Sequence, residues 1–434
     1  MRRKFVWLVP AVIVIAFASA FYKIYSTPAA AQFKAPVTVI AVTEPVRFET
    51  HFASSKTFVQ VHAASSIELK DGRIRSFWFS GSREGAKDVS IRSAVFDPAK
   101  SQWGAEEVVM TREFTQQALH RYIAKLGNPV AGRAADGSLR MFYVTVSMGG
   151  WAGSSITTMT SRDEGASWSE PQRLVTSPFV NISTLVKGAP FLYADGTMGV
   201  PVYHEFISKF AEILRVDANG AVLDKQRLAA GGQGSLQPVV LVQNAQTAQV
   251  LMRYAGAAEP SRVLMASTQD AGQHWSAAGK SNLRNPDAAL GGVALPDGRL
   301  LAVLNDMEHG RDALSLMISA DDGKTWREVQ KLEDQQAASA QADEAHFTSN
   351  VQTLIPQSDS AATERLAQYV ESTKRTVCKD GRCRYEFSYP YLIQTVSGDF
   401  HLVYTWNRTF IKHLRFNQAW VNQRLQEHSH DALH

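Results

Sequence analysis

Two adjacent titratable residues stand inside a strand-like run of the sequence. His204 and Glu205 are flanked by Val202 and Phe206. Burying two titratable groups in such a run costs free energy unless they have partners or a function. The pair is therefore a candidate for proton transfer.

Three arginines, Arg83, Arg253 and Arg311, lie at the ends or edges of predicted strands. A guanidinium group binds a carboxylate through two parallel hydrogen bonds, so these arginines are candidates for holding an acidic ligand. The alternative for each is a solvated surface charge. His62 and Asp88 have similar alternatives, as a satisfied core histidine and as a turn aspartate that caps its own loop.

Aromatic and basic residues also gather near the end of the chain. Tyr389 and Tyr391 alternate with Pro390, and we expect one of the two to serve only in packing. Residues 406–408 and 412–413 are interpreted as a solvated last strand rather than as part of a site.

These side chains need a scaffold, and a repeated motif indicates one. The pattern Ser/Thr-x-Asp-x-Gly-x-x-Trp occurs at residues 161–168, 268–275 and 319–326. In this Asp box the Asp accepts backbone N–H bonds across a turn, the Gly supplies a positive φ, and the Trp fills the gap between sheets. Degenerate copies at Asp97 and Asp217 extend the series to five.

The spacing of these boxes predicts the fold. Successive boxes lie about fifty residues apart, which suits the four strands of one propeller blade. The five boxes and a last strand group at 387–416 predict an all-β, six-bladed β-propeller over residues 36–420. We expect strands from the N-terminal part to close the last blade. Long amphipathic helices are not expected, apart from weak candidates near 114–125 and 361–371.

Residues 333–386 interrupt this rhythm and indicate an insertion on the propeller surface. Cys378 and Cys383 flank the hairpin-turn pair Asp380-Gly381, so we expect a disulfide in an oxidising compartment. The alternative is a metal pair, but no second Cys or His pair stands nearby at ligand spacing. No metal and no cofactor are expected.

The composition is that of a folded globular protein, with 45% hydrophobic and 20% charged residues in a chain of 434. The 45 basic and 41 acidic residues are spread along the chain, without a dense basic block outside the extreme N-terminus. Nucleic acid is therefore not an expected partner.

Residues 1–31 are predicted to be an export segment. A basic start at Arg2, Arg3 and Lys4 precedes an apolar run over residues 5–22, and small residues follow at 29–31. The run is long for a signal-peptide core and short for a membrane span, so cleavage and retention as an inner-membrane anchor both remain open. We expect the rest of the chain in the periplasm, either soluble or anchored.

With these boxes, the chain resembles the sialidase (neuraminidase) superfamily, and more specifically bacterial BNR-repeat proteins called predicted neuraminidases, over about residues 55–420. Sialidases hold the substrate carboxylate with three arginines, use a tyrosine nucleophile activated by a glutamate, and use an aspartate as acid/base. The boxes themselves are specific to the fold and say little about chemistry.

The resemblance implies roles for several residues. Arg311, which precedes a strand that runs into a box, matches the third arginine, and Arg253 resembles the second. Tyr389 resembles the nucleophile, with Tyr391 as its rival. Asp88, placed shortly after a further candidate arginine in the same loop, stands where the acid/base is expected.

Two departures weaken the match. His62 occupies the place of the first arginine, and a neutral imidazole offers one donor where a guanidinium offers two. Only Gln237 stands near the place of the activating glutamate. Because a phenol with a pKa near ~10 needs a base to attack at neutral pH, His204 or Glu205 would have to supply it.

The leading hypothesis is an exo-sialidase-like glycoside hydrolase that acts on an acidic sugar of a glycan or polysaccharide. Arg253 and Arg311 would hold the carboxylate, and Tyr389 would attack with retention of configuration. One alternative is a uronate polysaccharide lyase in which His62 or His204 removes a proton next to a carboxylate. The other is a non-catalytic carbohydrate-binding propeller, which the missing glutamate supports.

Overall fold

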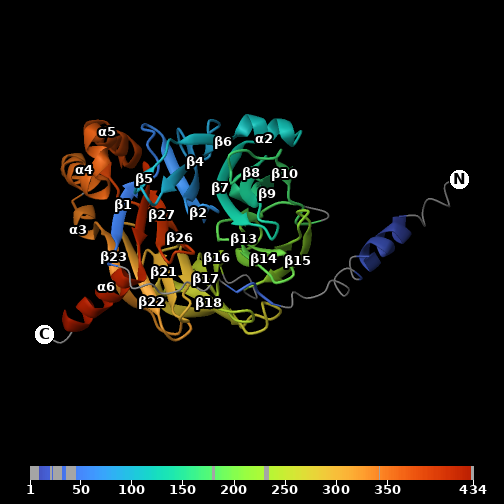
Figure 1. Ribbon diagram of the computed structural model, residues 1–434. Coiled ribbons are helices and arrows are strands. Elements are labelled where there is room, and N and C mark those ends of the chain that lie inside the picture. Colours follow the sequence, from blue (N-terminus) through green and yellow to red (C-terminus); the bar gives the residue numbers. More distant parts are fainter. Residues whose placement is uncertain are drawn as a thin grey trace.

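The computed structural model describes residues 9–19, 22, 32–35, 45–177, 181–228, 234–341 and 343–431. In this part of the chain, six antiparallel sheets of four or five strands follow one another around a common centre (Figure 1). The predicted six-bladed β-propeller is therefore confirmed.

The first three blades follow each other without interruption. Blade 1 contains β2 (Gln60–Glu68), β3 (Ile74–Gly81), β4 (Ser90–Asp97), β5 (Gln102–Trp103) and β6 (Glu107–Thr111). Blade 2 contains β7 (Lys125–Arg133), β8 (Leu139–Val146), β9 (Ser154–Ser161) and β10 (Gln172–Arg173). Blade 3 contains β11 (Leu185–Val186), β12 (Phe191–Leu192), β13 (Met198–His204), β14 (Phe210–Val216) and β15 (Val222–Arg227).

The remaining blades complete the ring. Blade 4 contains β16 (Ser235–Val242), β17 (Ala248–Tyr254), β18 (Arg262–Thr268) and β19 (Gly279–Arg284). Blade 5 contains β20 (Gly291–Ala294), β21 (Leu300–Leu304), β22 (Ala313–Ser319) and β23 (Arg327–Asp334). Blade 6 contains β26 (Phe387–Gln394), β27 (Phe400–Trp406), β28 (Phe410–Phe416) and, from the other end of the chain, β1 (Phe48–Phe52).

The ring closes through β1, as predicted. This strand pairs antiparallel with β28, so that Phe48 lies opposite Phe416 and Phe52 lies opposite Lys412. Because β1 takes the outer edge of blade 6, β28 becomes an interior strand, and its seven residues are all buried.

The Asp boxes occupy the turns between the third and fourth strands of their blades. In the first box, the Asp163 carboxylate accepts from the backbone N–H of Ser167 at 2.9 Å and from the Ser161 hydroxyl at 2.8 Å. Gly165 adopts a φ of +87°, which a side chain would strain. The degenerate copies at Asp97 and Asp217 stand at the equivalent turns, after β4 and β14.

Antiparallel order sorts the connecting loops onto two faces of the ring. We call the face with the boxes the box face. The opposite face, called the site face, carries the loops from the second to the third strand of each blade. Four of these loops are used below, at residues 82–89, 205–209, 305–312 and 407–409.

The insertion between β23 and β26 is mostly helical, so the expectation that long helices are absent is wrong. It contains α3 (Gln336–Ser339), α4 (Glu344–Ser358), the 3-10 helix η3 (Ser360–Arg365), α5 (Leu366–Val377), and the hairpin of β24 (Cys378–Lys379) and β25 (Arg382–Cys383). Helix α4 begins at an Asp343 cap and buries Phe347, Val351 and Ile355, which recur every four residues, against blade 6. The insertion lies at the outer side of this blade (Figure 1).

Other helices differ from expectation in extent. The candidate near 114–125 is α2 (Arg112–Ala118), which ends early because residues 119–124 form the turn that leads into β7. The candidate near 361–371 is found as η3 and α5. The short 3-10 helix η1 (Trp151–Gly153) and the last helix, α6 (Gln418–Asp431), were not predicted.

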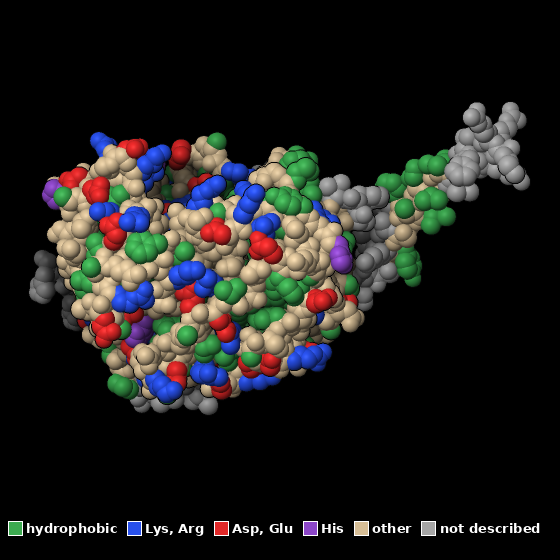
Figure 2. Space-filling view, turned by 90° about the horizontal axis from the view of Figure 1, so that it is seen from above, with side chains coloured by type: hydrophobic (Ala, Val, Ile, Leu, Met, Phe, Trp, Pro, Cys, Tyr) green, Lys and Arg blue, Asp and Glu red, His purple; other side chains and the backbone are tan. Residues whose placement is uncertain are grey.

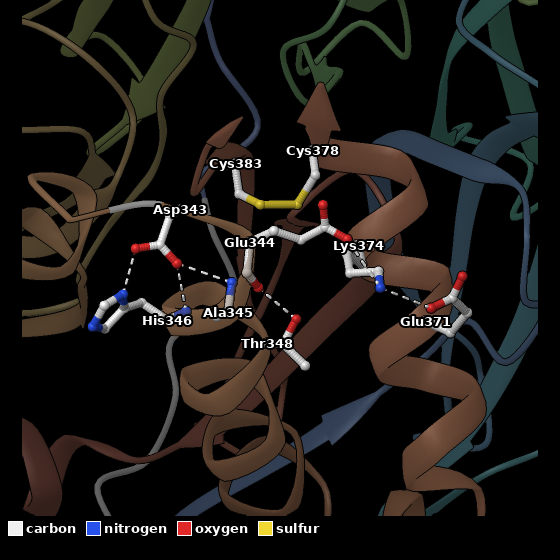
Figure 3. The surroundings of a disulfide bond; sticks show 9 residues. All are labelled: Asp343, Glu344, Ala345, His346, Thr348, Glu371, Lys374, Cys378 and Cys383. Atoms are coloured by element: carbon white, nitrogen blue, oxygen red, sulfur yellow. Dashed lines mark hydrogen bonds and ion pairs between the residues drawn. A yellow bond between two sulfur atoms is a disulfide. The ribbon is translucent and has the colours of Figure 1, made fainter. Parts of the chain in front are cut away.

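The disulfide between Cys378 and Cys383 is confirmed (Figure 3). The two cysteines lie opposite each other across the hairpin, as expected for residues that flank an Asp-Gly turn. Lys374 of α5 bridges Glu344 of α4 at 3.0 Å and Glu371 at 3.3 Å, which ties the two helices together beside the disulfide.

The N-terminal part is described only in pieces. Residues 9–19 are helical and expose apolar side chains such as Val14 and Ile15. The basic start at residues 2–4 and the small residues at 29–31 lie outside the described residues. In the part of the chain that the structure describes, no helix has the length and apolar character of a membrane span. Figure 2 shows basic and acidic side chains mixed over one side of the propeller.

Candidate active site

The centre of the site face holds Tyr389, the predicted nucleophile, in hydrogen-bond contact with Gln237. The Gln237 amide nitrogen donates to the Tyr389 hydroxyl at 3.0 Å and lies 3.3 Å from the hydroxyl of Tyr203. The Gln237 oxygen accepts from Arg253 at 3.1 Å. Gln237 thus stands between the phenol and a guanidinium, where the resemblance placed a glutamate.

A repeated backbone device aims these side chains inward. Tyr389, Gln237 and Asn128 each have a positive φ, lie at a β-bulge in the first strand of their blade, and precede a proline. A bulge re-aims a side chain, and proline is tolerated there because the ladder hydrogen bond is already lost. Asn128 donates to the Tyr203 hydroxyl at 3.2 Å, so the three bulges converge on one cluster.

The structure brings the two predicted arginines together through Asp287. Arg253 pairs with the Asp287 carboxylate at 2.6 Å, and Arg311 donates to the Asp287 carbonyl oxygen at 2.9 Å. Burial disfavours the charge of Arg253, but the nearby Tyr389 and Asp287 outweigh this effect and raise its pKa. Arg311 also lies 3.6 Å from Glu386.

A third guanidinium, missed in the sequence, comes from Arg408. Its Nε lies 2.9 Å from both carboxylate oxygens of Glu386, and its Nη1 donates to Glu84 at 2.7 Å. Burial alone would raise the pKa of Glu386, but Arg408 outweighs it and lowers that pKa. Arg408 and Arg311 therefore share one carboxylate.

The expectation of a solvated last strand at 406–408 and 412–413 is wrong. Trp406, Asn407 and His413 are fully buried, and Lys412 is 7% exposed. The physical reason is the added outer strand β1, which the local sequence of β28 does not reveal.

His62 stands at the site but is closed off from ligands. Its side chain is 3% exposed, its Nδ1 lies 2.9 Å from the Thr405 hydroxyl, and its ring centroid lies 4.1 Å from that of Tyr389. Burial, reinforced first by Arg408 and then by Arg311, lowers its pKa well below the usual value. His62 is therefore a neutral ring packed against the phenol.

His204 and Glu205 have different surroundings. His204 Nε2 lies 2.8 Å from Glu212, and its ring stacks on Phe210, so the structure does not bring it to Tyr389. Because neighbouring side chains on a strand point to opposite faces, His204 lies on the face of β13 opposite Tyr203. Glu205 is half-buried and lies in the field of Arg253. Burial raises its pKa, while Arg253 and Lys209 oppose the rise.

The loop at 82–89 presents a different carboxylate from the expected one. Asp88 is exposed and accepts from the backbone N–H and the hydroxyl of Ser82, each at 2.9 Å. Its slight burial would raise its pKa, but these bonds outweigh it and lower the pKa. Arg83 is exposed and has no side-chain partner among the described residues. It is Glu84 of this loop that reaches the centre.

Tyr391, the rival of Tyr389, is a packing residue. It is 4% exposed, and the Lys187 ammonium nitrogen lies 5.7 Å from its ring centroid. Lys187 donates to the carbonyl oxygens of Leu290 and Pro390, which joins blades 3, 5 and 6 at the centre. Burial lowers the pKa of Lys187 to about 7.

The arrangement can bind an anion and can hold a phenol beside it. Arg253, Arg311 and Arg408 come from blades 4, 5 and 6, and Tyr389 lies in the field of Arg253. Within the described ranges, no three His, Cys, Asp or Glu side chains are placed to hold a metal ion.

Comparison with known proteins bears on the family and the fold. The family model described as "BNR repeat-like domain" matches residues 72–402. No protein of curated function matches the sequence.

Solved structures share the fold at low sequence identity. The Hadza microbial sialidase Hz136 is 15% identical with a TM-score of 0.61, and the match covers 83% of this chain and 66% of that one. A Dyadobacter fermentans protein of unknown function is 14% identical with a TM-score of 0.61, covering 86% and 99%. The intramolecular trans-sialidase from Ruminococcus gnavus is 12% identical with a TM-score of 0.57, covering 86% and 97%. At these identities the likeness concerns the fold alone.

Proposed function

The chain belongs to the family of BNR repeat-like domains, and from that premise we propose that it binds an acidic sugar at the centre of its site face and hydrolyses the glycosidic bond in the manner of a sialidase. One observation carries the proposal. Guanidinium groups from three blades, Arg253, Arg311 and Arg408, gather around Tyr389, although the expected first arginine is replaced by His62.

Arg311 is the main anchor for the sugar carboxylate. Arg253 and Arg408 already pair with Asp287 and Glu386 at hydrogen-bond distance. With the residues that the structure describes, Arg311 makes one hydrogen bond, to a carbonyl oxygen, and one longer ion pair at 3.6 Å. A guanidinium carries five N–H donors, so Arg311 keeps donors for a bidentate contact with a ligand.

Tyr389 is the proposed nucleophile and Glu205 the proposed proton carrier. As the phenolic oxygen attacks the anomeric carbon, Glu205 takes the phenolic proton and passes it to the departing oxygen. Water then attacks the anomeric carbon, breaks the glycosyl-tyrosine bond and, through Glu205, returns a proton to the phenolic oxygen, so that configuration is retained. Glu205 suits proton transfer because it lies near Arg253 and burial raises its pKa above the usual value for a carboxyl group. Asp88 is less suited because it is exposed and bonded within its own loop.

A second candidate is a carbohydrate-binding propeller without catalysis. The observation that favours it is the Gln237 amide, which donates to the Tyr389 oxygen and cannot accept its proton. The uronate lyase alternative has less support, because His62 is closed in by Thr405 and His204 is engaged by Glu212.

The test compares Tyr389→Phe with Tyr391→Phe, a matched change of a packing tyrosine. Each is incubated with a fluorogenic sialoside and with uronate polysaccharides, while fluorescence, ultraviolet absorbance of unsaturated uronate, and binding by calorimetry are recorded. Hydrolysis that is lost only in Tyr389→Phe supports the proposal. Binding without product, sensitive to Arg311→Ala, favours the binding module. Unsaturated product favours the lyase, and a protein that neither binds nor cleaves any of these sugars refutes all three.

A further inference from the structure

A groove leads outward from the arginine cluster beneath the insertion. Its inner part is a cavity of about 420 Å³ whose lining includes Arg311, Glu386, Ser339 and Arg384. Its outer part is a cavity of about 1220 Å³. Ser339, Cys383 and Arg384 line both, so the two cavities adjoin each other. We call this the hairpin groove, because the disulfide hairpin forms its outer wall.

Alternation along the wall sends basic side chains into solvent beside the groove. In residues 382–386, Cys383 and Tyr385 are buried, while Arg382 and Arg384 are exposed and Glu386 is half-buried. Side chains that alternate in this way point to opposite sides of an extended segment. Arg382, Arg384 and Glu386 thus share one side, and the run ends at the carboxylate that Arg311 and Arg408 share.

The groove has cations without partners. Among the described residues, Lys379, Arg382 and Arg384 line it and make no side-chain hydrogen bond or ion pair. Two carboxylates along it, Asp312 and Asp380, likewise have no side-chain partner.

The other charges of this part of the insertion are engaged elsewhere. Asp343 caps α4 and pairs with His346, and Lys374 is bound between Glu344 and Glu371 (Figure 3). Among the described residues, the groove therefore has three unpaired cations and two unpaired carboxylates, and the three cations lie on its hairpin wall.

We infer that the hairpin groove is a second anion subsite, centred on Arg384, that takes the acidic group of the sugar residue next to the one held by Arg311. The inference rests on the proposed function, since it needs an acidic sugar at the centre. It assigns the substrate to acidic oligosaccharides or polysaccharides with neighbouring charged residues. The insertion would then determine specificity for chain length, and the disulfide would hold Arg384 at the groove.

The test compares a monomer with a short polymer. Calorimetry measures the affinity of the full chain for N-acetylneuraminic acid and its linear trimer, and for galacturonic acid and its trimer. Arg384→Ala is compared with Arg375→Ala, a matched control in α5 whose guanidinium pairs with Glu371 outside the groove. We expect the wild type to bind one trimer about tenfold more tightly than its monomer, the scale of one charge-assisted contact. Arg384→Ala removes this preference and leaves monomer affinity unchanged, while Arg375→Ala changes neither.

Equal affinity for trimer and monomer in the wild type overturns the subsite and leaves the central site standing. A loss in Arg384→Ala that affects monomer and trimer equally also overturns it. If no monomer binds, the proposed function fails and the subsite fails with it. A Cys378→Ser/Cys383→Ser variant, with folding checked by circular dichroism, provides a second measurement. It is expected to lose the trimer preference, and an unchanged preference contradicts the positioning role of the disulfide.

Discussion

The amide nitrogen of Gln237 donates a hydrogen bond to the phenolic oxygen of Tyr389 across 3.0 Å, while the amide oxygen of the same side chain accepts from Arg253. An amide in this position orients the phenol and links it to a cation. It cannot remove the phenolic proton. The site therefore has a well-held nucleophile and no base in direct contact with it.

Gln237→Glu is expected to raise the rate of glycoside hydrolysis. The new carboxylate would accept from the Tyr389 hydroxyl and keep its contact with Arg253. A positioned general base contributes about 10²- to 10⁴-fold, so an increase of about tenfold or more should be measurable as the initial rate on a fluorogenic sialoside. Gln237→Ala should not give this increase. A rate for Gln237→Glu at or below that of the wild type would show that the missing base does not limit the reaction.

Arg408→Lys is expected to weaken binding of an acidic monosaccharide about tenfold, because an ammonium replaces a planar fork that binds two carboxylates. Arg408→Ala should weaken binding further and lower the thermal midpoint, since Glu386 loses its main partner and its pKa rises. Calorimetry and thermal unfolding measure the two effects. Arg83→Ala is the control, as Arg83 is exposed and has no side-chain partner among the described residues. An equal loss of affinity in Arg83→Ala would contradict the assignment of Arg408 to the binding site.

The fold was predictable because its signals are local. Asp163 and Gly165 form their turn through contacts within the box, and Asp97 and Asp217 accept similar backbone N–H bonds in the equivalent turns. The helices of the insertion were harder to predict from the sequence. They depend on three buried residues of α4 that meet blade 6 only in the folded chain, within a segment whose composition suggests a loop.

The site was predictable in part. The resemblance pointed to Arg253, Arg311 and Tyr389, which the structure places near one another, whereas Arg408 and Glu386 depend on how blade 6 is closed by a distant strand. The sequence also contains a signal for the inward-pointing residues. Asn128, Gln237 and Tyr389 each precede a proline in the first strand of a blade, which marks a bulge that aims the side chain inward.

Acidification is expected to destabilise the seam between blades 1 and 6 through two buried histidines. Trp103 donates its indole N–H to His413 at 3.2 Å, and His413 Nε2 lies 2.9 Å from His401 Nδ1. Because an indole only donates, His413 is neutral and donates to His401. Burial lowers the pKa of His401 to about 3 and that of His413 well below its usual value.

These lowered pKa values mean that acidification lowers the free energy of unfolding. The unfolded chain takes up protons below a pH of about 6.5, while the folded chain does not, so the contribution to stability is complete above that pH and falls toward pH 3. Near pH 5 the loss from His401 is about 2 kcal/mol, and His413 adds to it in the same direction. Urea unfolding at pH 7 and pH 5 measures it. His401→Leu should show a smaller pH-dependent loss than the wild type, and the exposed His346→Gln the same loss. An identical loss in His401→Leu would argue against the mechanism.

Phe33→Ala is expected to lower stability without changing sugar binding. Phe33 is 1% exposed, stacks on Tyr193 at 5.4 Å between ring centroids, and donates its backbone N–H to Ala245. Ala245 lies in the turn between β16 and β17, on the box face, so this contact is remote from Arg311. Truncating a buried phenylalanine costs about 3 kcal/mol or more.

Thermal unfolding and calorimetry with the same acidic sugar separate the two effects. Val46→Ala is the matched control, because Val46 belongs to the same N-terminal region but is 52% exposed, and it should change neither quantity. An unchanged midpoint in Phe33→Ala would show that residues 32–35 do not hold the propeller. A normal midpoint with weakened binding would place this segment at the site. The expected result, a lower midpoint with normal affinity, fits a chain whose residues 32–35 pack on the face opposite the arginines.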